Sequence, residues 1–111
     1  MDESKTYPVQ LIRLAAFLDA LSHPARLEII EYLALNQECA EGSISDKLPL
    51  CKSSVSQHLT KLKEVGIISC KPQGACKEYC LNDGVFEHLK ISILDFIQRM
   101  DELKEIKVEV D

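Results

Sequence analysis

The sequence predicts a mainly helical fold with one small β-hairpin. Two observations carry this prediction. Apolar residues recur every three or four positions through most of the chain, and one stretch, residues 67–81, has the pattern of two short strands around a turn. The 111 residues, 46% apolar and 28% charged, are sufficient for a single domain over 1–111. The longest unbroken apolar run, 14–18, is too short to cross a bilayer, and the N-terminus lacks a secretory signal pattern. We therefore expect a cytoplasmic protein with no membrane partner.

Two helices are expected in the first third of the chain. The first spans residues 8–21, with Pro8 in its opening turn, where the fixed φ of proline suits a helix start. Its apolar residues at helical spacing are Val9, Leu11, Ile12, Leu14, Ala15, Leu18 and Leu21. The second helix begins at Ser22-His23-Pro24 and runs to about Leu35. Its apolar stripe consists of Leu27, Ile30, Leu33 and Ala34.

A short third helix is expected over residues 43–48. Ser43 and Asp46 have the spacing of a capping box, in which a serine oxygen accepts from a free amide of the first helical turn. Pro49 ends this helix, because the residue before a proline avoids the helical conformation.

A fourth, amphipathic helix is expected over 53–65, and Gly66 is its left-handed stop. Val55, Leu59 and Leu62 form its apolar stripe, whereas Ser54, Gln57, His58 and Lys61 point elsewhere. Two helices joined by about three residues, the second with a polar outer face, match the plan of a helix-turn-helix over 43–65.

Two short strands, 67–71 and 76–81, are expected around Pro72-Gln73-Gly74, so that residues 67–81 form a candidate wing. The length of the turn decides where Cys70 lies. A two-residue turn at Gln73-Gly74 places Cys70 opposite Lys77 and leaves Cys76 on the other face. A turn of odd length places Cys70 on the same face as Cys76 and Cys80. Both registers agree with the sequence.

A long final helix is expected over 85–106. Its apolar stripe consists of Phe86, Leu89, Ile93, Phe96, Ile97, Met100 and Leu103, with Ile91 and Leu94 beside it. Residues 22–82 have apolar stripes of their own, so part of the helices 8–21 and 85–106 stays uncovered in a monomer. The uncovered residues are Leu11, Leu14, Leu18, Phe96, Met100 and Leu103. We expect a homodimer through these two helices; the alternative is that they only cap their own domain.

Charge is distributed unevenly along the chain. The net charge is −5, yet residues 51–77 contain five lysines against Glu64 alone, which gives +4 there and −9 for the remainder. Phosphate attraction acts over a Debye length of about 8–10 Å, so a local basic face suffices to hold a nucleic acid. The alternative is that the same charge distribution belongs to an ordinary solvated surface rich in lysine.

Four motifs follow one another between residues 20 and 83. They are Leu21-Ser22-His23-Pro24-Ala25-Arg26-Leu27-Glu28-Ile29-Ile30, Ser53-Ser54-Val55-Ser56-Gln57-His58-Leu59-Thr60-Lys61-Leu62, Gly66-Ile67-Ile68 and Gln73-Gly74. In this order they resemble the ArsR/SmtB family of winged helix-turn-helix repressors. The resemblance implies a homodimeric transcriptional repressor that an inducer, often a metal ion, releases from its operator. His23 departs from the family's acidic or small polar residue, and we interpret it as a helix-start residue.

Polar and basic residues of 53–65 and of the hairpin are candidates for contacts with double-stranded DNA. A helix in the major groove needs short or flexible polar side chains near the base edges. The helix offers Ser53, Ser54, Ser56, Gln57 and His58, with Lys61 and Lys63 as phosphate contacts. The hairpin offers Lys71, Gln73 and Lys77. In a twofold dimer two such helices lie about one DNA turn apart, which predicts an inverted-repeat operator.

Cysteines are the candidates for sensing. Cys51 lies where the helix 53–65 begins, and a helix N-terminus together with Lys52 favours its thiolate. We hypothesise that oxidation or metalation of Cys51, with Cys70 and Cys76 as further candidate thiols, weakens DNA binding. The alternative is that Cys51 is a small half-buried residue and Ser53 caps the helix.

Neither metal site known from the family carries over. The arsenic-type site needs a tight cysteine cluster ahead of the reading helix, where this chain has Cys39 only. The zinc-type site needs acids and histidines along the last helix, where Asp83 is followed by Val85 and Phe96. The cofactor is therefore unknown, and the candidate inducers are a thiol-reactive metal, a metalloid or an oxidant.

Two other classes of protein compete with a DNA-binding regulator. An enzyme is not expected, because no cysteine has a convincing base and orienting acid, and no C-x-x-C pair exists for a zinc finger. The alternative function is a winged-helix protein–protein interaction module without DNA binding, which the acidic total charge favours.

Overall fold

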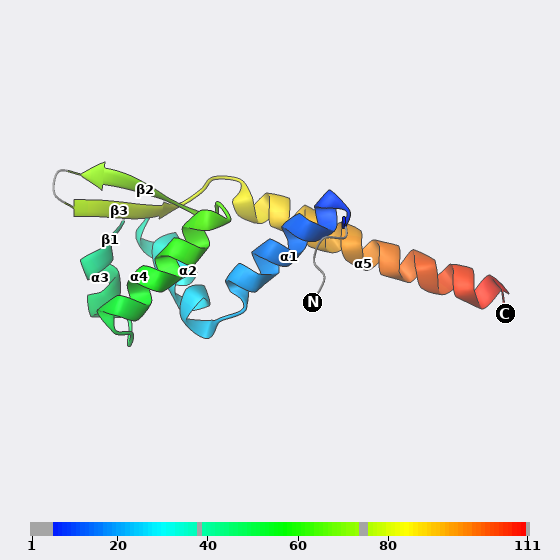
Figure 1. Cartoon of the computed structure of the whole chain (residues 1–111), viewed down its shortest axis with the longest axis horizontal. Helices are drawn as coiled ribbons and strands as arrows, with labels where there is room; N and C mark the ends of the chain where they lie inside the picture. The colour runs from blue at the N-terminus through cyan, green and yellow to red at the C-terminus, as the bar shows by residue number, and fades with distance from the viewer. Residues whose placement is uncertain (1–5, 38, 74–75, 111) are drawn as a thin grey trace.

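The computed structural model describes residues 6–37, 39–73 and 76–110. A head of short elements sits at one end of the molecule, and a single long helix projects from it (Figure 1). The overall dimensions are 63 × 33 × 24 Å. The elements in chain order are α1 (Val9–Leu21), α2 (Pro24–Asn36), β1 (Cys39–Ala40), α3 (Glu41–Lys47), α4 (Lys52–Glu64), β2 (Ile68–Gln73), β3 (Cys76–Leu81) and α5 (Val85–Val110). This order confirms the predicted winged-helix arrangement and adds the strand β1.

The core of the head lies where α2, α3, α4 and the hairpin meet. Its fully buried side chains are Ile29, Leu33, Ile44, Val55, Leu59, Leu62, Ile67 and Ile68. The predicted apolar stripe of α4 is confirmed, since all three of its members belong to this set. The predicted stripe of α2 is partly wrong: Leu27 and Ala34 are exposed, and the buried face instead includes Ala25 and Ile29.

The start of α3 differs from the prediction. The helix begins at Glu41, two residues early, and no side chain caps its N-terminus, so the predicted capping box is wrong. The cause is β1, which pairs with β3 through Ala40↔Glu78 and leads the chain directly into the helix. Ser43 therefore lies inside the helix, and the hydroxyl of Ser45 donates back to the carbonyl of Glu41 at 3.2 Å.

The turn between α4 and β2 follows the prediction for Gly66. Gly66 has φ +80°, a backbone conformation that glycine adopts at no steric cost. Its N–H donates to the Lys63 carbonyl, and the Ile67 N–H donates to the Leu62 carbonyl. These two bonds form a Schellman motif, which satisfies the last carbonyls of α4.

The sheet has the strand order β1-β3-β2, with antiparallel neighbours. Gln73 pairs with Cys76 and belongs to β2, so the register differs from the one that has its turn at Gln73-Gly74 and Cys70 opposite Lys77. β2 also continues through Pro72, which an edge strand tolerates because its outer N–H groups need no partner.

This register decides the relation among the hairpin cysteines. Cys70 pairs with Tyr79, and Cys80 pairs with Ser69. Because neighbouring residues of a strand point to opposite faces, Cys70 and Cys80 lie on opposite faces of the sheet. The side chain of Cys76 lies outside the described residues.

The two terminal helices lie against each other outside the head (Figure 1). Their apolar residues Leu11, Leu14, Ala15, Leu18, Ile93 and Phe96 line a groove of about 330 Å³. Leu14 is buried within its own chain, contrary to the prediction that it stays uncovered, whereas Leu18, Met100 and Leu103 are exposed as expected. No described helix is long and apolar enough to span a membrane.

Candidate nucleic-acid interface

The outward side of α4 is polar along its whole length. Its apolar side is buried in the head, which fixes the orientation of the helix. The exposed residues are Lys52, Ser53, Ser56, Gln57, Thr60, Lys63 and Glu64. Four of these, Ser53, Ser56, Gln57 and Lys63, are predicted DNA contacts. We call the seven residues together the α4 outer face.

Cys51 is the N-cap residue of α4, so it lies where the helix begins, as expected. Ser53, the alternative cap, lies in the first turn. The Cys51 Sγ lies 3.0 Å from the Ser54 Oγ and 3.6 Å from the Ser53 Oγ. The hydrogen bond with Ser54, followed by the one with Ser53, lowers the pKa of Cys51 to about 7. The acidity of this thiol thus comes mainly from neighbouring hydroxyls. The prediction from the sequence had named Lys52 and the helix N-terminus as the causes. Ser54 contacts Cys51 and is only partly exposed.

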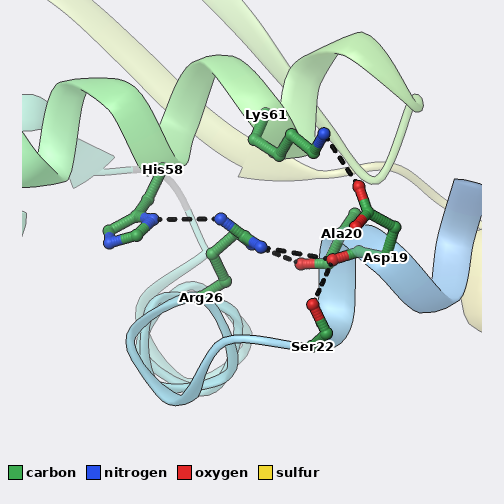
Figure 2. A network of polar contacts seen from close by, with 6 residues as sticks. All are labelled: Asp19, Ala20, Ser22, Arg26, His58 and Lys61. Carbon is green, nitrogen blue, oxygen red and sulfur yellow. Dashed lines mark hydrogen bonds and ion pairs between the residues drawn. The ribbon is translucent and has the colours of Figure 1, made fainter.

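Arg26, in the first turn of α2, joins three helices (Figure 2). Its Nε donates to the Ala20 carbonyl at 2.6 Å and its Nη2 to the Asp19 carbonyl at 3.2 Å, so it satisfies carbonyls at the C-terminus of α1. Its Nη1 donates to the His58 Nδ1 of α4 at 3.3 Å. Because a guanidinium only donates, the Nδ1 of His58 is unprotonated in this arrangement.

His58 therefore faces inward toward α2 and not toward the α4 outer face. Its ring lies 4.6 Å from the ring of His23. His23 is the N-cap of α2, and its Nδ1 accepts from the Ala25 N–H at 3.0 Å, which confirms it as a helix-start residue. Burial, and then the charges of His23 and Arg26, lower the pKa of His58.

Replacing His58 by glutamine should weaken the pH dependence of folding. The folded protein binds fewer protons at His58 than the unfolded chain does, because the folded-state pKa is the lower one. The stabilising effect is therefore complete above the ordinary histidine pKa of about 6.5 and is lost as the pH falls through the folded-state value. Urea unfolding at pH 7.5 and 5.5, on either side of the ordinary histidine pKa of about 6.5, checks this. Between the two pH values the wild type should lose more stability than His58→Gln. Equal losses would contradict it.

Lys61 also turns away from the centre of the α4 outer face. Its Nζ forms an ion pair with the Asp19 Oδ2 at 2.8 Å (Figure 2). The hydrogen bond and the positive charge of Lys61 hold the pKa of Asp19 below its usual value. The predicted phosphate contact is thus already engaged by an acid of α1.

The hairpin places its lysines on different faces. Lys77 borders a groove of about 340 Å³ between the hairpin and α4, which Ser56, Thr60 and Lys63 also line. Lys71 lies opposite Glu78 in the register of β2 and β3. Its side chain therefore points to the opposite face of the sheet from that of Lys77. It lies beside Leu33, Gln37 and Cys80. The side chain of Gln73 lies outside the described residues.

Tyr79 also lines this groove. Its hydroxyl donates to the Glu41 Oε1 at 3.2 Å. Burial, followed by the charges of Cys70 and Glu41, raises the pKa of Tyr79 to about 12. Cys70 is thus a half-buried neighbour of Tyr79. In the described part of the chain no three histidine, cysteine or acidic residues gather closely enough to hold a metal ion.

Comparisons with known proteins agree with this geometry. Residues 23–69, which include α2, α3 and α4, match the model of the bacterial regulatory protein family arsR. The transcriptional repressor SdpR of Bacillus subtilis is 32% identical over 82 residues, which cover 74% of this chain and 90% of SdpR. The chain belongs to the arsR family.

Two further proteins are similar to this chain. The nodulation protein NolR of Rhizobium meliloti is 39% identical over 57 residues, which are 51% of this chain and 46% of NolR, so the match spans less than half of that relative. An ArsR-like transcriptional regulator from Rhodococcus has the same fold, with a TM-score of 0.74 over 89% of this chain and 96% of the other, at 20% identity. Membership makes the chain a DNA-binding transcriptional regulator and not an enzyme.

Sequence reasoning missed several residues of this region. Lys52 and Thr60 share the α4 outer face, and the periodicity that placed Gln57 there would also have placed them. Arg26 and Asp19 were missed because their contacts depend on how the end of α1 approaches α4. The position of Arg26 within the first motif was the only signal for it.

Proposed function

We propose that the protein is a homodimeric repressor that binds an inverted-repeat operator through the α4 outer face and is released by an inducer. The observation that carries this proposal is the combination of a buried apolar side and an exposed polar side on α4. Hydroxyl and amide groups near its N-terminus suit base edges, and lysines suit phosphates. The similarity to a named repressor supports the repressor role. Such a protein acts in the cytoplasm, where the chromosome of a bacterium lies.

A second copy of the chain is the proposed partner of the terminal helices. The groove between α1 and α5 is lined by apolar residues only, and α5 continues beyond it with further exposed apolar side chains: Ile97, Met100, Leu103 and Ile106. An apolar surface of this length is rare on a monomeric protein, because burying it in a dimer is favourable. A twofold axis here would present two copies of α4 to one duplex.

The salt dependence of DNA affinity tests the proposed function. Non-specific binding to a random-sequence duplex needs no knowledge of the operator, and it falls steeply with salt for a protein that contacts phosphates. Replacing Lys63 by alanine should reduce the slope by about one phosphate contact. Lys90→Ala removes the same charge from an exposed position of α5 and is the matched control. A salt-independent or undetectable affinity would instead favour the protein-interaction module.

Cys51 is the proposed site at which a thiol-reactive inducer acts. It is exposed at the N-terminus of α4, where a metal, a metalloid or an oxidised sulfur would lie beside Ser53 and Ser54, two of the predicted DNA contacts. The rate of its alkylation by iodoacetamide should rise to half its maximum near pH 7, because the pKa of Cys51 is about 7. Ser54→Ala should move this midpoint to higher pH. Mass spectrometry of the peptide that contains Cys51 gives the rate, and a midpoint at the value of an ordinary thiol would contradict the proposal.

A further inference from the structure

The contact between Asp19 and Lys61 joins the last turn of α1 to α4 and is supported on the α1 side. The backbone carbonyl of Asp19 accepts from the hydroxyl of Ser22 at 2.7 Å and from Arg26 at 3.2 Å. Arg26 also holds the Ala20 carbonyl and reaches His58, one helical turn before Lys61 (Figure 2). The Asp19 carboxylate is therefore presented to Lys61 by a backbone that three hydrogen bonds hold in place.

We propose that Asp19 competes with DNA phosphate for Lys61, so that α1 limits the DNA affinity of α4. This inference rests on the proposed function, because only a DNA-binding α4 brings a phosphate to Lys61. In the free protein the carboxylate occupies the ammonium group of Lys61. On the duplex a phosphate oxygen takes the place of the carboxylate.

The exposure of the pair makes such an exchange feasible. The side chains of Lys61 and Asp19 are 40% and 61% exposed, and ion pairs this exposed are held weakly and are screened by salt. Lys61 lies on the flank of α4 next to the outer face, and lysine has a long flexible stem. After the exchange the Asp19 carboxylate stays within a Debye length of the bound phosphate and repels it. Both effects reduce the affinity of the wild type.

The location of Asp19 connects this contact to the dimer helices. Its neighbour Leu18 lines the apolar groove between α1 and α5. A shift of α1 within the dimer would therefore move the carboxylate relative to Lys61 and change the DNA affinity of α4. An inducer that moves α1 would then change the DNA affinity without binding at the α4 outer face.

The substitution Asp19→Asn tests the proposal, because it removes the charge and keeps the backbone carbonyl that Ser22 and Arg26 bind. Affinity for a random-sequence duplex at about 50 mM salt should rise roughly three- to tenfold, and the salt slope should steepen by about one contact. Asp95→Asn is the matched control, since Asp95 is 62% exposed and pairs with Arg99 on α5. It should have a much smaller effect.

The same substitution in a Lys61→Gln protein shows whether the contact between Asp19 and Lys61 causes the gain in affinity. In a Lys61→Gln protein the gain from Asp19→Asn should shrink to the smaller part that comes from the charge of Asp19 near the duplex. The proposal is overturned if Asp19→Asn gives no gain, a gain no larger than that of Asp95→Asn, or the same gain in the Lys61→Gln background. A wild type that shows no salt-dependent DNA binding overturns the proposed function as well, which distinguishes the two failures.

Discussion

Replacing Ile97 by aspartate is expected to convert the proposed dimer into a monomer and to lower the affinity for an inverted-repeat duplex by about 100-fold or more. Ile97 lies on the predicted apolar stripe of α5 and is 49% exposed in the single chain, so the substitution should leave the fold of the chain intact. In a dimer the second α4 binds intramolecularly, at a high effective concentration, and a monomer loses this gain. Sedimentation and DNA titration measure the two effects.

Ile91→Asp is the matched control for this prediction. Ile91 is 58% exposed and lies six positions earlier on α5, about 120° from Ile97 around the helix and on the side away from the groove residues Ile93 and Phe96. The Ile91→Asp protein should remain a dimer and bind DNA as the wild type does. An Ile97→Asp protein that stays dimeric would refute the proposed interface, and so would a monomeric wild type.

Replacing Leu59 by alanine is expected to lower the free energy of unfolding by about 2–5 kcal/mol. Leu59 is 1% exposed on the inner side of α4, in the same core cluster as Ile44 and Ile68. The cost combines lost apolar burial with the cavity left behind. Urea unfolding measures it, and Thr60→Ala, at the neighbouring exposed position, should change stability by no more than about 0.5 kcal/mol. Equal effects of the two substitutions would contradict the assigned orientation of α4.

The sequence predicts the structure correctly where one local rule decides it. The spacing of Val55, Leu59 and Leu62 predicted the buried side of α4, and Gly66 predicted the Schellman motif that ends the helix. Pro24 predicted the start of α2 and His23 the residue before it. In each case the residues involved lie within one helix or one turn, so no tertiary contact competes with the local preference.

Prediction failed where a distant contact decides the structure. The two residues of β1 have no periodicity of their own, and only pairing with β3 makes them a strand and moves the start of α3 to Glu41. Helical spacing placed Lys61 and His58 among the outward residues of α4, but the end of α1 and the start of α2 lie against that flank. The ion pair with Asp19 and the contact with Arg26 follow from this packing.

We propose that the α4 outer face enters the DNA groove. Backbone amide shifts of the isotope-labelled protein, recorded as a duplex selected from random DNA is added, test this docking. We expect the amides of the second half of α5 to move very little and a second set of shifts around Lys77. The largest shifts should fall on Ser53, Ser56, Gln57 and Lys63. Shifts that leave α4 unchanged while another surface responds would contradict it.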